Sequence, residues 1–122
     1  MKKFIKSLLY AFAGIKLAFA EQRNIQIHFT ILLLVIATGL VLGITLNEWL
    51  AVMLAASIVV SVEMINTAIE KTVDLASPNI HPLAKQAKDI AAGAVLIAVF
   101  FAVIIGMLVF GKYLLQFLSD YL

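Results

Sequence analysis

The residues best suited to chemistry are polar side chains spaced along one predicted helix. Four of them recur at intervals of three or four residues: Glu63, Asn66, Glu70 and Asp74. At 100° per residue they fall within an arc of about 80°, and Glu63 lies about 10.5 Å from Glu70 along the helix axis. Such a stripe of carboxylates and an amide could bind a cation or carry protons. A structural alternative is that these side chains join helices or reach toward the membrane surface.

Two lysines and an aspartate follow this stripe after a short turn. Lys85, Lys88 and Asp89 lie at the start of the next predicted helix. Carboxylates alone would bind a cation and lysines alone an anion. Both together suit a metal-bound polyphosphate, in which carboxylates and phosphate oxygens hold Mg²⁺ and lysine neutralises the remaining charge. The sequence has no Walker A or kinase-type glycine-rich loop, so a nucleotide site here would differ from the common ones. For Lys88 alone, an interfacial anchor is the simpler interpretation.

The composition identifies the solvent in which these residues must be held. Of 122 residues, 64% are hydrophobic and 13% are charged, against roughly 25% charged in a soluble domain. The mean hydropathy is +1.10. A soluble enzyme, a nucleic-acid binder and a disordered chain are therefore excluded. The absence of cysteine excludes disulfides, thiolate metal sites and a cysteine nucleophile. We expect a single-domain integral membrane protein.

Long uncharged stretches define the expected membrane spans. Residues 29–46, 49–62 and 90–111 carry no charge, and they lack the alternation of barrel strands. We predict an all-α membrane fold in one domain, residues 1–122, with the following segments: a surface helix at 1–22 and membrane-crossing helices at about 25–46, 48–75 and 84–117. Asn47 and Glu48 would form a very short turn, and the segment 77–82, which contains both prolines, the second connection.

The basic residues predict the orientation of these spans. Eight lie before the first span or between the second and third: Lys2, Lys3, Lys6, Lys16, Arg23, Lys71, Lys85 and Lys88. The opposite side carries only Lys112. The positive-inside rule therefore places the N-terminus and the loop at 77–82 in the cytoplasm and the C-terminus outside.

The first twenty residues have two interpretations. Three lysines, an apolar run and the Ala-Phe-Ala segment at 18–20 resemble a cleavable signal peptide. However, Lys16 lies inside the apolar run, and a helical wheel separates an apolar face from a basic one. We favour an interfacial helix along the cytoplasmic surface, acting either as an anchor or as a lid over a site.

Two motifs together resemble a known family. The first reads E-M-I-N-T-A-I-E over residues 63–70, with V-D at 73–74, and the second reads H-P-L-A-K-Q-A-K-D-I-A-A-G-A-V over 81–95. They resemble the prokaryotic diacylglycerol kinase family, and the H-P-L-A-K form looks most like its undecaprenol kinase branch. The resemblance covers nearly the whole chain, and a helix with E-x2-N-x3-E paired with K-D at the next helix start is highly specific.

The resemblance implies a homotrimeric lipid kinase of the bacterial cytoplasmic membrane, with its active site on the cytoplasmic side. It would transfer the γ-phosphoryl group of MgATP to the hydroxyl of undecaprenol, with diacylglycerol as the alternative acceptor. By position, Glu63 would be the general base, Glu70 a ligand of Mg²⁺ near the nucleotide, and Asn66 a support for both.

The same resemblance implies a nucleotide site around the second motif. Lys88 would contact the phosphates and Asp89 the nucleotide. Tyr10 and the loop from Asn79 to His81 would lie near the base. The resemblance assigns no role to Asp74.

One position departs from the family pattern. The family usually places a metal-binding Glu two residues before the Asn that here is Asn24, and that position holds Gln22, with Glu21 one residue earlier. A shift of one residue turns a helical side chain by about 100°. We favour Glu21 as the second metal ligand, because a helix end can absorb this rotation, and Gln22 is the alternative.

Two other protein classes share part of this pattern. A small cation or proton channel could use Glu63 and Glu70 as pore carboxylates, but it would need neither Lys88 and Asp89 nor the His81 loop. A holin-like or structural membrane protein would tolerate replacement of these carboxylates by Gln.

Overall fold

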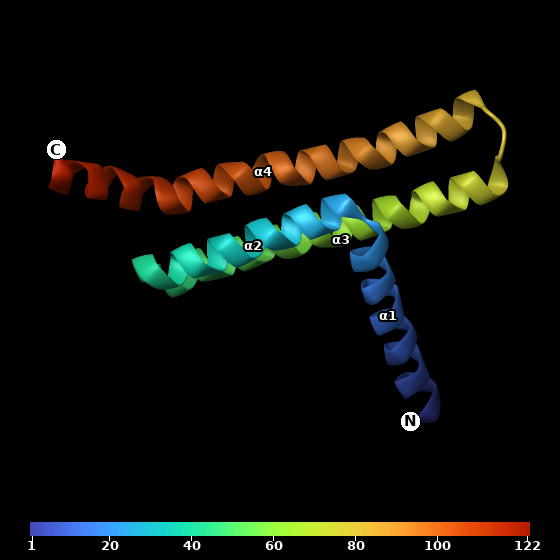
Figure 1. Ribbon diagram of the computed structural model, residues 1–122, viewed down its shortest axis with the longest axis horizontal. Helices are drawn as coiled ribbons and strands as arrows, with labels where there is room; N and C mark the ends of the chain where they lie inside the picture. Colours follow the sequence, from blue (N-terminus) through green and yellow to red (C-terminus); the bar gives the residue numbers. More distant parts are fainter.

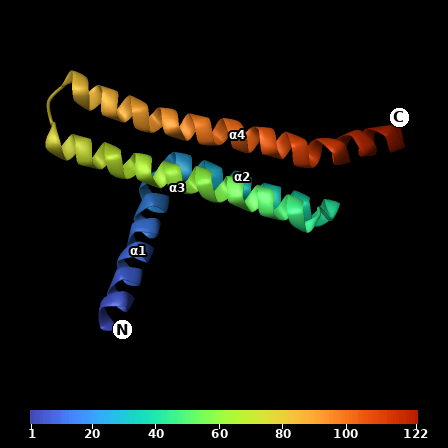
Figure 2. The same cartoon turned by 180° about the vertical axis from the view of Figure 1, so that it is seen from behind.

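The computed structural model describes all residues 1–122 as four helices joined by short connections: α1 (Lys2–Glu21), α2 (Arg23–Leu42), α3 (Leu46–Ala76) and α4 (Pro82–Tyr121). Helices α2, α3 and α4 run side by side, whereas α1 leaves them at a steep angle (Figures 1 and 2). Those three are apolar and long enough to cross a membrane. The predicted all-helical class with three candidate spans is therefore confirmed.

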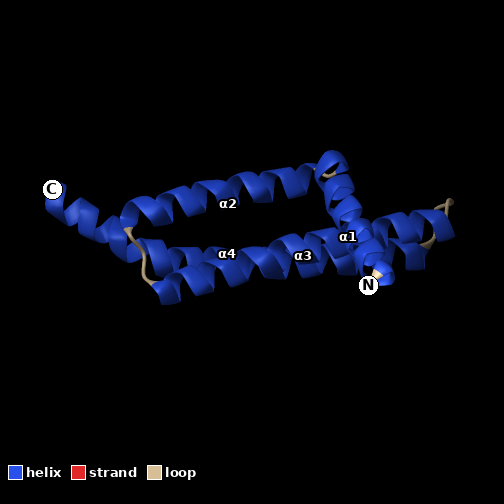
Figure 3. Ribbon diagram, turned by 90° about the horizontal axis from the view of Figure 1, so that it is seen from below, coloured by secondary structure: helices blue, strands red, loops and turns tan.

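Helices α3 and α4 form an antiparallel hairpin, with α2 along one side of it (Figure 3). They continue past the junction of α1 and α2 to the connection between Ser77 and His81, which lies at the far end of the hairpin (Figure 1). Because α2 and α4 run in the same direction, the end of α1, the end of α3 and the start of α4 occupy the same half of the molecule. This arrangement positions the candidate site.

The expected turn at Asn47 and Glu48 is wrong. Helix α2 ends at Leu42 and is followed by Gly43, whose φ of 63° lies in the left-handed region that favours glycine. Helix α3 begins at Leu46, capped by Thr45: the Thr45 side chain accepts from the Glu48 backbone N–H at 3.3 Å, and the Glu48 carboxylate accepts from the Thr45 N–H at 2.8 Å. This reciprocal capping box places Asn47 and Glu48 inside the first turn of α3.

A close approach at Gly39 joins α2 to this end of the hairpin. A Cβ at Gly39 would lie 2.8 Å from the Trp49 indole and 3.0 Å from Ile44. Glycine therefore lets Trp49 of α3 pack against the backbone of α2. Trp49 also packs on a small cluster formed by Ile44, Val52 and Val109, which includes a residue of α4.

Polar contacts add to the packing at this same end. Glu48 forms an ion pair with Lys112 and accepts a hydrogen bond of 2.7 Å from the Tyr113 hydroxyl. The only basic residue on the predicted outer side is thus paired with the carboxylate that also caps α3. The rest of the molecule is mostly exposed, because only 12 of 122 residues are buried. The apolar surfaces of the spans therefore have to be covered by lipid or by other chains.

Candidate functional site

Glu63 and Asn66 are deeply buried on α3, with exposed fractions of 2% and 7%. Thr67 is buried beside them, and its hydroxyl donates to the Glu63 backbone carbonyl at 3.0 Å. No hydrogen bond or ion pair within the chain engages the Glu63 carboxylate, so this group is free to accept a proton or a hydrogen bond from a ligand. An unpaired carboxylate on a residue that is 2% exposed is costly in an apolar setting and is therefore a candidate for function.

Asn66 connects this buried position to Glu70. Its side-chain NH₂ donates to Glu70 Oε1 at 3.3 Å, while its own Oδ1 is buried and has no hydrogen-bond partner. The hydrogen bond orients the amide, because turning it over would set two oxygens against each other. The enclosed Asn66 oxygen and the partly buried Glu70 carboxylate therefore belong to residues one turn apart on the same face of α3.

Lys88 reaches this face from α4. Its ammonium group forms an ion pair with Asp74 of α3, with side-chain exposures of 39% for Lys88 and 64% for Asp74. Asp89 is paired instead with Lys85, one turn earlier on α4. The structure thus brings Lys88 to the predicted stripe, whereas Asp89 and Lys85 form an exposed pair within their own helix.

The connection between α3 and α4 has a defined geometry. His81 is the N-cap of α4, and its Nδ1 accepts a hydrogen bond of 3.1 Å from the Leu83 backbone N–H. Pro82 follows at the first helical position, where its missing N–H has no cost. The Ser77 hydroxyl donates to the Asn79 carbonyl at 3.0 Å. Asn79 and His81 therefore lie in an ordered turn that leads directly into the helix carrying Lys88.

Tyr10 is not brought to this turn within the single chain. It lies on α1, which projects away from the hairpin, and it is 73% exposed (Figure 1). Any role of Tyr10 near a nucleotide therefore requires another copy of the chain or a movement of α1.

The junction of α1 and α2 holds the two alternative metal ligands. Gln22 is the single extended residue between the helices, with φ −104° and ψ 109°. Glu21 Oε2 lies 2.6 Å from Lys71 Nζ on α3, and the two side chains are about half exposed. Lys71 was not identified from the sequence as a site residue, because a pairing across 50 positions leaves no trace in local spacing.

The donor set is compatible with a magnesium ion carried by a nucleotide. No group of three His, Asp or Glu side chains is gathered as a metal cluster. Mg²⁺ at phosphate-transfer sites usually takes one or two carboxylates and completes its shell with phosphate and water oxygens. Glu70 supplies one such carboxylate, and the unpaired Asn66 oxygen beside it lacks the donor or cation that a buried oxygen needs.

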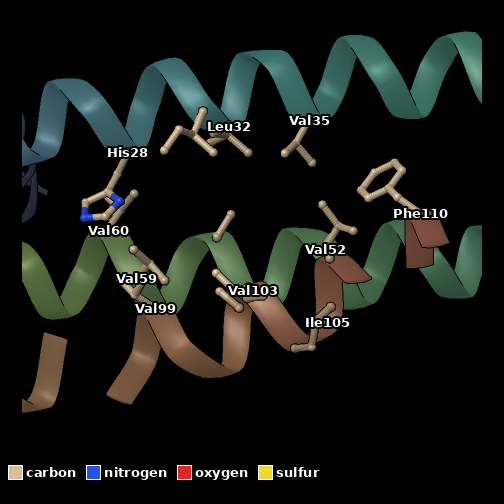
Figure 4. A pocket seen from close by; sticks show the side chains of 15 residues that line it. His28, Leu32, Val35, Val52, Val59, Val60, Val99, Val103, Ile105 and Phe110 are labelled. Atoms are coloured by element: carbon tan, nitrogen blue, oxygen red, sulfur yellow. The ribbon is translucent and has the colours of Figure 1, made fainter. Parts of the chain in front are cut away.

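An apolar pocket of about 270 Å³ lies between α2 and the α3–α4 hairpin (Figure 4). Its 15 lining residues include 13 hydrophobic ones, so it suits an apolar chain and not a nucleotide. His28 of α2 lies at one end and Phe110 of α4 at the other, with Val59 and Val60 of α3 on the wall (Figure 4). Glu63 follows Val59 and Val60 by about one helical turn.

The fold and the site thus define a small membrane protein of three candidate spans, with carboxylates, an amide and a lysine in the half of the helical hairpin that ends at the α3–α4 connection. Residues 9–110 match the family model of prokaryotic diacylglycerol kinase. The chain belongs to this family, as its two motifs predicted.

Curated relatives support this assignment over most of the chain. The undecaprenol kinase of Bacillus subtilis is 40% identical over 110 residues, covering 90% of this chain and 89% of the relative. A diacylglycerol kinase of Synechocystis is 44% identical over 101 residues, covering 82% of this chain but 58% of that longer relative. A diacylglycerol kinase of Helicobacter pylori is 37% identical over 114 residues, covering 93% and 86%.

Proposed function

We propose that this protein is a lipid kinase that transfers the γ-phosphoryl group of MgATP to the hydroxyl of undecaprenol. Family membership and the named activities of the relatives support a lipid kinase. The 40% identity to an undecaprenol kinase over nearly all of both chains supports undecaprenol as acceptor. Diacylglycerol is the second candidate, because two of the relatives described above are diacylglycerol kinases.

The observation that carries the mechanism is the carboxylate of Glu63, which has no partner within the chain although the residue as a whole is only 2% exposed. In the proposed reaction the acceptor hydroxyl donates its proton to Glu63 as its oxygen bonds to the γ-phosphorus. The bond from that phosphorus to the β,γ-bridging oxygen breaks, and ADP leaves. Phosphoryl transfer otherwise depends mainly on positioning and charge neutralisation.

Glu70 is the proposed metal ligand, with Asn66 supporting it and Glu63. The hydrogen bond from Asn66 orients the Glu70 carboxylate, and the Asn66 oxygen is left without a partner within the chain. Glu21 or Gln22, at the junction of α1 and α2, would supply a further oxygen. When bound, Mg²⁺ would neutralise charge on the β- and γ-phosphate oxygens.

Lys88 is the proposed phosphate contact. Its present partner is Asp74, so phosphate binding would exchange one anionic partner for another and free Asp74. Asp89 would contact the nucleotide, and Asn79, His81 and Tyr10 would line the site for its base. The ordered turn capped by His81 supports a fixed place for this edge of the site.

The proposed assembly is a homotrimer in the bacterial cytoplasmic membrane, with α1 as an amphipathic surface helix. The N-terminus and the site would face the cytoplasm, and the C-terminus would lie outside. The few buried residues of the single chain and the separation of Tyr10 from the turn at 77–81 support an assembly in which neighbouring copies complete the site.

A transfer assay tests the proposed function directly. The purified full chain in mixed micelles is given radiolabelled MgATP with undecaprenol, with diacylglycerol, or with no acceptor. We expect labelled lipid phosphate chiefly with undecaprenol. More labelled product with diacylglycerol would show that diacylglycerol, and not undecaprenol, is the preferred acceptor. Absence of labelled lipid with both acceptors, together with ion flux in vesicles, would instead support the channel alternative.

A further inference from the structure

The junction between α1 and α2 is a stiffly built elbow. The Gln26 side-chain amide of α2 donates to the Phe19 carbonyl of α1 at 2.9 Å. The rings of Phe19 and Phe29 pack edge to face, with centroids 5.1 Å apart at 85°. Ile25, which follows the bend, is fully buried. These contacts hold α1 to α2 around the single extended residue, Gln22, but neither the hydrogen bond nor the ring pair involves α3.

One ion pair ties this elbow to the helix that carries the site. Glu21 Oε2 and Lys71 Nζ are 2.6 Å apart, and this is the only ion pair between α1 and α3. Lys71 directly follows Glu70 in α3. The last residue of α1 is therefore fastened beside the residue proposed to hold the metal.

The value of this pair lies in geometry and not in stability. Its two side chains are 53% and 45% exposed, and exposed ion pairs add about 0–1 kcal/mol or less to folding. However, α1 extends about 28 Å from Glu21 at 1.5 Å per residue, and Tyr10 lies about 16 Å along it. A rotation of about 10° at the elbow would therefore move Tyr10 by about 3 Å, and displacements of about 1 Å can reduce catalysis strongly.

We propose that Glu21 and Lys71 are positioning residues, whose ion pair sets the angle of α1 relative to the Glu70 face of α3. The inference rests on the proposed kinase function, because the group being positioned is the part of α1 that would contribute to the nucleotide site. It gives Lys71 a role in the reaction without contact with the reacting atoms. It also engages the Glu21 carboxylate with a lysine, so that of the two proposed metal ligands at the junction Gln22 is the one this inference leaves for the metal.

The angle can be measured independently of activity. Because the chain has no native cysteine, spin labels at Ser7→Cys on α1 and Leu75→Cys on α3 report one intramolecular distance by pulsed electron paramagnetic resonance. Dilution with unlabelled protein suppresses distances between copies. We expect Lys71→Gln to broaden or shift the distribution, and both Lys71→Arg and the exchanged pair Glu21→Lys with Lys71→Glu to restore it. Lys2→Gln removes a lysine far from the elbow and should leave the distribution unchanged.

Kinetics of the same variants, without the labels, complete the test. Lys71→Gln should raise the KM for MgATP by about 3–10-fold and change kcat less, because it disturbs positioning and leaves the reacting groups in place. The exchanged pair should recover most of this loss. A native distance distribution in Lys71→Gln, or no recovery in the exchanged pair, would overturn the proposal that the Glu21–Lys71 ion pair sets the angle of α1.

The proposed kinase function is tested separately from the role of the ion pair. If the unmodified chain transfers no phosphoryl group to any lipid, the kinase proposal fails, whereas the distances still decide whether the ion pair sets the angle of α1. Tighter Mg²⁺ binding in Lys71→Gln, with an unchanged distance between the two spin labels, would show that the released Glu21 carboxylate becomes a metal ligand. This result would also contradict the proposed positioning role.

Discussion

Asn66 donates its side-chain amide to the Glu70 carboxylate at 3.3 Å, while the Asn66 oxygen is buried without a partner. The two residues lie one turn apart on α3, so the hydrogen bond orients the Glu70 carboxylate and leaves the Asn66 oxygen enclosed without a hydrogen-bond donor at the same place. A buried polar oxygen without a partner costs about 1–3 kcal/mol. This cost is understandable if a ligand supplies the missing contact in the working state.

Replacing Asn66 by Ala should therefore weaken Mg²⁺ binding during turnover more than it lowers the stability of the fold. The variant frees the Glu70 carboxylate to rotate and removes the unpaired oxygen. We expect the Mg²⁺ concentration for half-maximal activity to rise by about tenfold, because losing a residue that orients a metal ligand typically weakens metal affinity by about 10–100-fold. A Mg²⁺ titration of initial rates checks this, with Thr72→Ala, an exposed change on α3, as control. An unaltered titration would remove Asn66 from the metal site.

Which residue at the elbow binds the metal, Glu21 or Gln22, is tested by three further substitutions. If Glu21 binds the metal, Glu21→Gln should sharply raise the Mg²⁺ requirement, and Gln22→Ala should have little effect. If Gln22 is the ligand, Gln22→Glu should lower the requirement, because a charged oxygen holds this hard cation better than an amide oxygen. If none of the three variants changes the Mg²⁺ requirement, Glu70 holds the metal without help from this segment.

The close approach of α2 and α3 predicts a stability defect at Gly39. A Cβ there would meet the rigid Trp49 ring at 2.8 Å, so Gly39→Ala should lower the free energy of unfolding by about 1–3 kcal/mol. Thermal unfolding in detergent micelles measures this change. Gly111→Ala is the matched control, because no side chain and no other helix lies within 4 Å of its added Cβ. Equal midpoints for the two variants would contradict the packing.

The proposed assembly is tested by crosslinking. The single chain buries 12 of its 122 residues, and its site residues lie on helices whose remaining faces are exposed. Crosslinking in a mild detergent that preserves activity should yield trimers at protein concentrations where a dissociated control in harsh detergent gives monomers. An active species that remains monomeric by crosslinking and by sedimentation would contradict the homotrimer.

The sequence was sufficient for the class of fold and for the residues on α3, because hydrophobic length and a helical period are local properties. The spacing of Glu63, Asn66 and Glu70 predicted a common face, and their burial and hydrogen bond agree with it. The turn predicted at Asn47 and Glu48 is wrong, because two adjacent polar residues can begin a helix as well as interrupt one. The capping box that joins Thr45 to Glu48 instead begins the next helix there.

Contacts between helices could not be predicted in the same way. The pairing of Lys71 with Glu21 and of Lys112 with Glu48 joins residues far apart in the chain, and only the crossing of the helices brings them together. Lys88 was placed near the stripe by its level in the membrane, whereas its partner Asp74 emerges from the packing of α3 on α4.

The central claim, that Glu63 is the general base, is tested most directly by Glu63→Gln. The amide keeps the size and can form hydrogen bonds but cannot take the proton, so kcat for phosphoryl transfer to undecaprenol should fall by about 10²–10⁴-fold. Binding of MgATP, measured by calorimetry on the same preparation, should change little. A variant that retains full turnover would contradict the assignment.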